Sequence, residues 1–65
     1  MEIKKDQIYS PNDLEKAQIA KKQTLAQWRH ESRGPAYIKS GRRVLYRGDD
    51  VLTWIDGRRV RTHAD

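Results

Sequence analysis

Residues 33–46, RGPAYIKSGRRVLY, decide the fold that the rest of the chain completes. Two short runs with apolar and β-branched side chains, 37–39 and 42–46, stand on either side of the pair Ser40-Gly41. Short strands around a two-residue turn, with Gly at its second central position, are typical of a β-hairpin. We therefore predict a two-stranded β-hairpin in this segment.

The predicted hairpin is strongly basic. Four basic side chains and no acidic one fall within the nine positions from Lys39 to Arg47. A solvated turn requires only Gly and a polar residue, so this charge favours contact with DNA phosphates or the minor groove. Protection of an exposed edge strand by like charge is a compatible explanation. The candidate DNA-contacting residues of the hairpin are Lys39, Ser40, Arg42, Arg43 and Arg47.

The segment before the hairpin is predicted to be a helix over residues 22–32. Arg33-Gly34-Pro35 ends it, because Gly accepts reversed backbone angles and Pro cannot continue the hydrogen-bond ladder. Leu25 and Trp28 share one face, which we expect to pack in the core. The opposite face is polar and almost free of acid, and glutamine there can bond adenine through both its donor and its acceptor. The candidate base-contacting residues are Lys21, Lys22, Gln23, Ala26, Gln27 and His30.

A shorter helix is predicted over residues 11–18. Ser10 can cap it, Pro11 suits the first helical position, and Asp13 completes a capping box with Ser10. Its apolar stripe is narrow, so it must brace against the following helix. Residues 1–7 are mostly charged and are expected to be a flexible lead-in, with only Ile3 able to pack.

The segment after the hairpin is predicted to form a third helix. Asp49 and Asp50 suit its first turn because of the macrodipole, and Gly57 suits its end. Trp28 and Trp54 are also candidate stacking platforms for single strands, but each falls on an apolar stripe, so we expect both in the core. The expected core residues are Leu14, Leu25, Trp28, Ile38, Val44, Val51, Trp54 and Ile55.

The length and composition of the chain limit the classes of function that it can have. The chain has 65 residues with 14 Lys or Arg and 9 Asp or Glu, a formal charge of +5, which favours a polyanionic partner such as nucleic acid. So short a chain forms one domain at most, without a deep substrate cavity. The absence of cysteine excludes disulfides and thiolate metal sites. Apolar runs are very short, so we expect a cytoplasmic protein with no membrane partner.

Catalysis and metal binding find little support in the sequence. His30 and His63 are far apart, and neither lies at a metal-ligand spacing from an acidic residue. Adjacent helical residues such as Asp49 and Asp50 diverge by about 100°, so they do not form a catalytic pair. We expect no cofactor, no metal and no enzymatic activity.

The order of these residues resembles the excisionase-type winged helix-turn-helix proteins of the MerR superfamily. The match extends from about Tyr9 to Arg59, and its most specific part is GPAYIKSGRRV followed by DVLTW. Ile19 stands where such proteins often have Gly, and Lys21 where a Ser commonly caps the second helix. The resemblance implies an α+β fold with three short helices and a two-stranded wing. Its divisions are a lead-in over residues 1–7, a winged helix-turn-helix DNA-binding domain over 8–57, and a basic C-terminal tail over 58–65.

The resemblance also implies a function. Family members that consist of this domain alone look most like phage and mobile-element excisionases, also called recombination directionality factors. These bind double-stranded DNA near an attachment site, bend it, bind beside copies of themselves and recruit a tyrosine- or serine-family integrase. Such a protein acts on the nucleoid of the bacterial host cell. Similar domains serve as transcriptional regulators of phage operons, and a protein-interaction module with a basic face is a further alternative.

Overall fold

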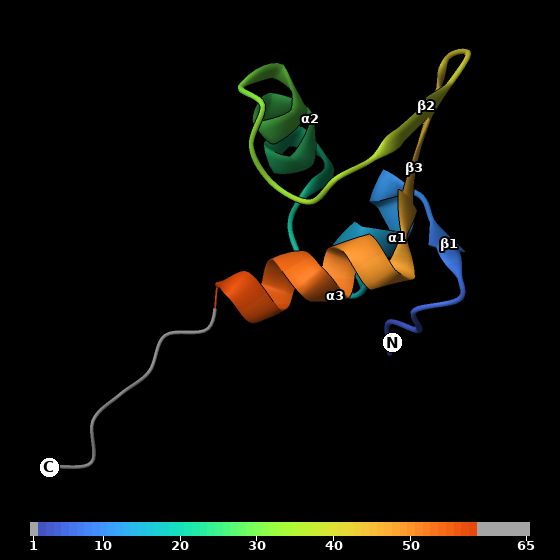
Figure 1. Cartoon of the computed structure of the whole chain (residues 1–65). Coiled ribbons are helices and arrows are strands. Elements are labelled where there is room, and N and C mark those ends of the chain that lie inside the picture. Colours follow the sequence, from blue (N-terminus) through green and yellow to red (C-terminus); the bar gives the residue numbers. More distant parts are fainter. Residues whose placement is uncertain (1, 59–65) are drawn as a thin grey trace, which may run out of the picture.

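Three short helices and three short strands follow one another along residues 2–58, the part of the chain that the computed structural model describes (Figure 1). The fold is α+β, with one antiparallel sheet of strand order β1-β3-β2. The basic tail predicted over residues 58–65 lies outside the described residues except for Arg58. The elements are β1 (Ile8–Tyr9), α1 (Pro11–Lys16), α2 (Lys22–His30), β2 (Ile38–Ser40), β3 (Arg43–Arg47) and α3 (Gly48–Gly57).

The sheet has three strands, where the sequence predicted two. β1 pairs with β3, placing Ile8 opposite Arg47 and Tyr9 opposite Tyr46. A strand of two residues is too short to show a period of two in the sequence, which is why it was missed. Tyr9 is nevertheless a core residue, because its side chain is only 8% exposed.

The turn of the hairpin lies one residue later than predicted. Ser40 pairs with Arg43, so the two central residues are Gly41 and Arg42 rather than Ser40 and Gly41. Gly41 has a φ of +61°, and Gly at the first central position is the pattern of a type II′ turn. The glycine therefore sets the turn as expected, but from its first position.

The capping box at the start of α1 is present as predicted. The Ser10 hydroxyl accepts from the Asp13 backbone N–H over 3.1 Å, and the Asp13 carboxylate accepts from the Ser10 N–H over 3.0 Å. The hydrogen bond that the carboxylate accepts from the Ser10 backbone, followed by its interaction with the Ser10 side chain, holds the pKa of Asp13 below its ordinary value of 3.8. Lys16 adds a smaller effect of the same sign, and desolvation opposes it.

The chain leaves α1 through a left-handed residue. α1 ends at Lys16, two residues before the predicted end, and Gln18 adopts a φ of +63°. The Gln18 N–H donates to the Glu15 carbonyl and the Ile19 N–H to the Leu14 carbonyl, which is the Schellman pattern. The residue with reversed backbone angles is therefore Gln18. Ile19, one position later, packs against the core.

α2 is capped by a neighbour and also ends in a Schellman pattern. Lys21 precedes it without a side-chain cap, and the Glu15 carboxylate accepts from the Lys22 N–H over 2.8 Å. The helix ends at His30, and Ser32, with a φ of +58°, reverses the chain. The predicted helix end at Ser32 was therefore two residues too late. Gly34 has the reversed backbone expected of it, with a φ of +84°, and it lies against Trp28, where a Cβ would come within 2.8 Å of the ring.

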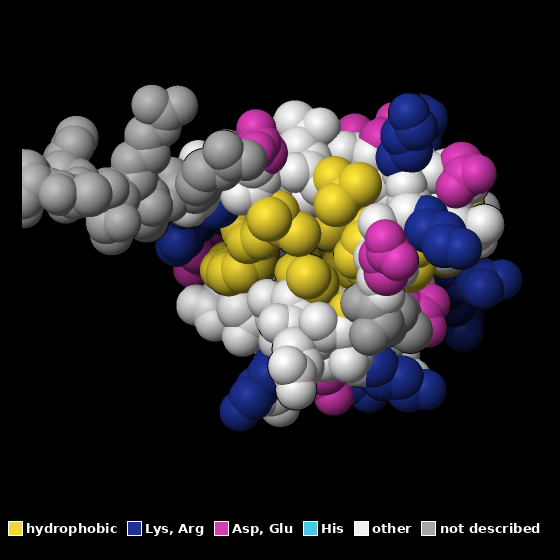
Figure 2. Space-filling model, turned by 90° about the horizontal axis from the view of Figure 1, so that it is seen from below, with side chains coloured by type: hydrophobic (Ala, Val, Ile, Leu, Met, Phe, Trp, Pro, Cys, Tyr) yellow, Lys and Arg dark blue, Asp and Glu magenta, His cyan; other side chains and the backbone are white. Residues whose placement is uncertain are grey.

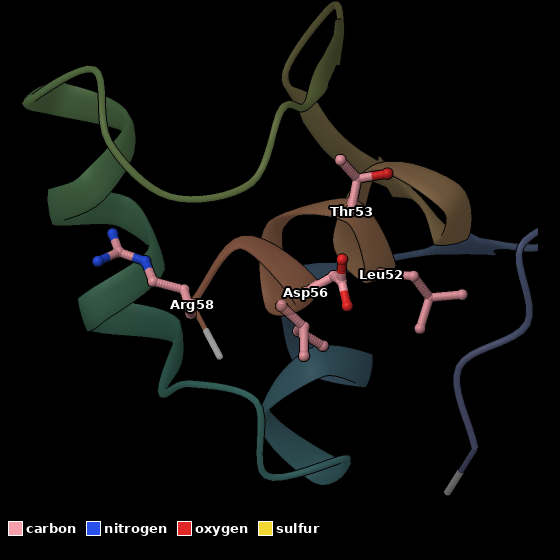
Figure 3. A pocket seen from close by; sticks show the side chains of 5 residues that line it. Leu52, Thr53, Asp56 and Arg58 are labelled. Atoms are coloured by element: carbon pink, nitrogen blue, oxygen red, sulfur yellow. The ribbon is translucent and has the colours of Figure 1, made fainter. Parts of the chain in front are cut away.

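The core consists of Tyr9, Leu14, Leu25, Tyr46 and Val51. Trp28 and Val44 are half-buried and pack against this group, and Trp54 is half-buried as well. Two residues expected in the core are exposed instead: Ile38 by 39% and Ile55 by 36%. Ile38 pairs with Leu45, whose neighbour Tyr46 points into the core, so Ile38 lies on the outer sheet face. Ile55 lies at the surface of α3, where it lines a shallow hollow with the exposed Leu52. Figure 2 shows apolar side chains gathered on this face of the molecule, and Figure 3 shows the side chains that line the hollow.

The segment before β1 is pinned to the start of α3. The Gly48 N–H donates to the Gln7 carbonyl over 2.8 Å, and the Lys4 N–H donates to the Tyr9 hydroxyl over 2.7 Å. A Cβ on Gly48 would overlap the Lys4 carbonyl oxygen. Ile3 packs against the core, as the sequence suggested. The remaining contacts of this segment were not predicted from the sequence.

Candidate nucleic-acid interface

One face of α2 is entirely exposed. Leu25 is fully buried on the other face, and Trp28 packs on Trp54 of α3 with ring centroids 5.1 Å apart. These two anchors orient the helix, because residues three apart share a face. The residues predicted to contact bases are all exposed: Lys21, Lys22, Gln23, Ala26, Gln27 and His30.

The hairpin residues predicted to contact DNA are exposed as well, but they divide between two faces of the sheet. Lys39 pairs with Val44, so it lies on the same face as Tyr46. Arg43 and Arg47 lie on the outer face. Arg47 also stands at the base of the hairpin, where it forms an ion pair with Asp49 over 3.2 Å. The exposed set is Lys39, Ser40, Arg42, Arg43 and Arg47.

α2 and the tip of the hairpin lie on the same side of the molecule, and α3 lies on the other (Figure 1). The structure therefore brings the two predicted sets of contacts to one side, apart from Arg47 at the hairpin base. α3 carries three aspartates and no lysine or arginine between Gly48 and Gly57. Basic side chains therefore lie on α2 and the hairpin tip and aspartates on α3, although Lys and Arg side chains also border the α3 side of the molecule (Figure 2).

Arg29 connects α2 to the hairpin, and the sequence did not identify it. Its guanidinium donates to the Tyr46 hydroxyl over 2.8 Å and lies 5.8 Å from the centroid of the Tyr37 ring. The two tyrosine rings are 6.2 Å apart. The one sequence signal was the position of Arg29 next to Trp28, at the border of the apolar stripe.

Glu31 interrupts the basic face at the end of α2. Its two carboxylate oxygens accept from the Gln27 side-chain amide and from the Arg33 guanidinium, each over 3.2 Å. Arg33 and Arg29 also line a shallow hollow of about 350 Å³ beside the loop that leads to β2. An anion that approached this end of α2 would meet two guanidinium groups and one carboxylate.

No known protein-family model, curated protein or solved structure matches this chain. Within residues 2–58, no helix is both long and apolar enough to cross a membrane. In the same part of the chain, no group of three or more His, Asp or Glu side chains is placed to hold a metal ion.

Proposed function

We propose that this chain is a winged helix-turn-helix protein that binds double-stranded DNA in a sequence-specific way. In this proposal α2 is the recognition helix, and the hairpin of β2 and β3 is the wing. Its role is that of a phage or mobile-element excisionase. It binds near an attachment site, bends the DNA and directs a tyrosine- or serine-family integrase toward excision, without catalysing a reaction itself.

The observation that carries this proposal is the common placement of the exposed face of α2 and the hairpin tip, with the acidic helix α3 on the opposite side. A helix fits the major groove of B-DNA, where the exposed Gln23 and Gln27 would contact base edges. The basic tip with Arg42 and Arg43 suits phosphates or the adjacent minor groove. An acidic helix on the far side keeps negative charge away from the duplex.

The mechanism is geometric. Several copies along one face of the duplex bend it, at a deformation cost of a few kcal/mol. Neutralisation of phosphates by the basic side chains offsets this cost, as do contacts between neighbouring copies or with integrase. The bent DNA then presents the attachment site to integrase in the arrangement that favours excision.

A mobility-shift titration tests this function. The purified protein is titrated on fragments that tile the source element, including the attachment region and nearby promoters, at near-physiological salt. Cooperative laddering at the attachment arms supports an excisionase. A single shift confined to a promoter would indicate a transcriptional regulator that uses the same surface. Binding no tighter than to random DNA would overturn the proposal and favour a module that binds an acidic protein.

A further inference from the structure

The side-chain amides of two glutamines on the exposed face of α2 differ in their surroundings. Gln23 and Gln27 lie one helical turn apart on the same face, because they are four residues apart. The Gln27 amide nitrogen donates to the Glu31 carboxylate over 3.2 Å. The Gln23 amide has no hydrogen-bond partner within residues 2–58. Of the two amides, that of Gln27 alone is held by a neighbour.

The chemistry of Glu31 decides which end of the Gln27 amide lies toward it. An ionised carboxylate only accepts hydrogen bonds, whereas an amide has one accepting oxygen and two N–H donors. Reversing the amide would place its oxygen against the carboxylate, and would replace a hydrogen bond to a charged group with repulsion. Glu31 therefore holds the amide with its nitrogen toward the carboxylate. The carbonyl oxygen and one N–H of Gln27 stay available for another partner.

Glu31 is itself held in place at the end of α2. Its second carboxylate oxygen accepts from the Arg33 guanidinium over 3.2 Å, so each of its two oxygens has one partner. The Glu31 N–H donates to the Gln27 carbonyl over 3.0 Å, and the Arg33 N–H donates to the Trp28 carbonyl over 2.6 Å. These backbone bonds fix both residues relative to the last turn of the helix. Arg33 thus orients the carboxylate, and the carboxylate orients the Gln27 amide.

The groups that remain available on Gln27 match adenine and not guanine. In the major groove adenine presents a donor, its N6 amino group, beside an acceptor, N7, whereas guanine presents two acceptors, O6 and N7. A carbonyl oxygen next to a single N–H pairs with the first pattern. Against guanine the same oxygen would face an acceptor, and the amide would have to leave Glu31 to supply two donors.

We propose that Glu31 is a positioning residue for base recognition, which orients Gln27 to select adenine over guanine at the base pair that Gln27 contacts. The inference rests on the proposed function, because it requires α2 in the major groove. Gln23 lacks such a partner within the described residues, so its amide is free to adopt the orientation that suits either purine. The two glutamines therefore differ in specificity although their side chains are identical.

The test measures base preference in a duplex library randomised at the bound site. The base pair that Gln27 contacts is the one whose preference is lost in Gln27→Ala, and we expect adenine there for the unsubstituted chain. Glu31→Gln should lower the ratio of adenine to guanine by about two- to tenfold, the factor for one hydrogen bond, because an amide both accepts and donates. Glu31→Lys should lower the ratio further, because an ammonium group only donates and attracts the Gln27 oxygen.

Two controls separate orientation from charge. Each substitution at Glu31 also makes the chain more basic, which tightens binding to every sequence and leaves the ratio unchanged. Glu2→Gln and Glu2→Lys make the same changes of charge at an exposed residue before β1, so they should not alter the ratio. In the Gln27→Ala background, neither substitution at Glu31 should change the base preference.

Side-chain amide resonances measured without DNA keep this inference distinct from the proposed function. Those of Gln27 should move in Glu31→Gln, and those of Gln23 should stay. Gln27 resonances that did not move, or a ratio that was the same for the unsubstituted chain and Glu31→Lys, would overturn the inference and leave DNA binding intact. If the unsubstituted chain showed no base preference at any position, the proposed function would fail, and base selection by Gln27 with it.

Discussion

The Arg29 guanidinium donates a hydrogen bond to the Tyr46 hydroxyl over 2.8 Å, and this bond joins α2 to β3. Tyr46 is 1% exposed, and Arg29 supplies a hydrogen-bond donor to its hydroxyl. The same guanidinium lies 5.8 Å from the Tyr37 ring, in the segment that leads into β2. Arg29 thereby fixes the position of the hairpin relative to α2, the two elements that we propose to contact DNA together.

Replacing Arg29 with Met tests this connection, because Met keeps the apolar stem and removes the donor. We expect Arg29→Met to lower the free energy of unfolding by about 1.5–3 kcal/mol, the contribution of a hydrogen bond to a charged group. Tyr46→Phe should cost about 1 kcal/mol. Urea denaturation of both single variants and the double variant measures their coupling. Costs that simply add would show that the bond contributes nothing to stability.

The contact between Gly48 and the Lys4 carbonyl predicts opposite effects at two glycines of α3. Gly48→Ala should lower the free energy of unfolding by about 1–3 kcal/mol, because the new Cβ displaces the segment before β1. Gly57→Ala is the matched control. Open space surrounds that position, so the higher helix propensity of Ala should stabilise the protein by roughly 0.5 kcal/mol. Denaturation curves of the two variants that moved in the same direction would contradict this account.

The left-handed backbone of Gln18 predicts a stabilising substitution. Its φ of +63° is costly for a residue with a Cβ but not for Gly. Gln18→Gly should therefore raise the free energy of unfolding by about 0.5–1 kcal/mol. Gln18→Ala separates backbone strain from loss of the side chain, and it should change stability little. If the Gly variant melted at a lower temperature than the Ala variant, the backbone of residue 18 would not be strained by a Cβ.

Ser32 offers the same test at the end of α2. Its φ is +58°, and the next residue, Arg33, closes the Schellman pattern by donating to the Trp28 carbonyl over 2.6 Å. Ser32→Gly should stabilise the protein by a similar amount to Gln18→Gly. The two gains should add, since the two turns lie at opposite ends of α2, and the double variant measures this additivity.

The lowered pKa of Asp13 predicts a loss of stability in acid. Its folded pKa lies below the ordinary value of 3.8, so below that pH the unfolded chain binds more protons than the folded one. The contribution is therefore present above pH 3.8 and is lost as the pH falls through the folded pKa. Melting temperatures on both sides of pH 3.8 should fall more steeply for the unsubstituted chain than for Asp13→Asn. If the melting temperatures of both chains fell equally with pH, the carboxylate of Asp13 would not be the cause of the acid sensitivity.

The sequence predicted much of this architecture from local signals. The capping box at Ser10 and Asp13, the strand period around Val44 and the stripe of Leu25 each depend on neighbours within a few residues. Such patterns are visible without tertiary structure. Because Leu25 is buried, the opposite face of α2 faces solvent, and this is the face that we propose to contact bases. The helical period alone predicts this relation.

What the sequence did not predict depends on contacts between distant residues or on register. β1 exists because Tyr9 pairs with Tyr46, 37 positions later. The exposure of Ile38 follows from a register in which it meets Leu45, and a shift of one residue exchanges the two sheet faces. Arg29 lies between two tyrosines that only the folded chain brings together. Its role was therefore not visible in the pattern of α2.

The proposed DNA-binding surface predicts different effects for one arginine and one glutamine. Arg43 is exposed at the hairpin tip, so Arg43→Ala should weaken binding to all sequences and reduce the slope of log affinity against log salt by about 1. Gln27 is exposed on α2, so Gln27→Ala should mainly reduce the preference for the target over random DNA, by about 1–3 kcal/mol. Titrations on target and random duplexes at several salt concentrations measure both quantities.

Two further variants show whether these effects arise at the surface we propose. Thr53→Ala changes an exposed side chain of α3, on the far side of the molecule, and should leave both affinities unchanged. Glu31→Gln removes the carboxylate that accepts from Gln27 and Arg33, so it should tighten binding to every sequence by reducing repulsion from phosphates. If Arg43→Ala and Gln27→Ala left the affinity for target DNA unchanged, α2 and the hairpin would not be the recognition helix and wing.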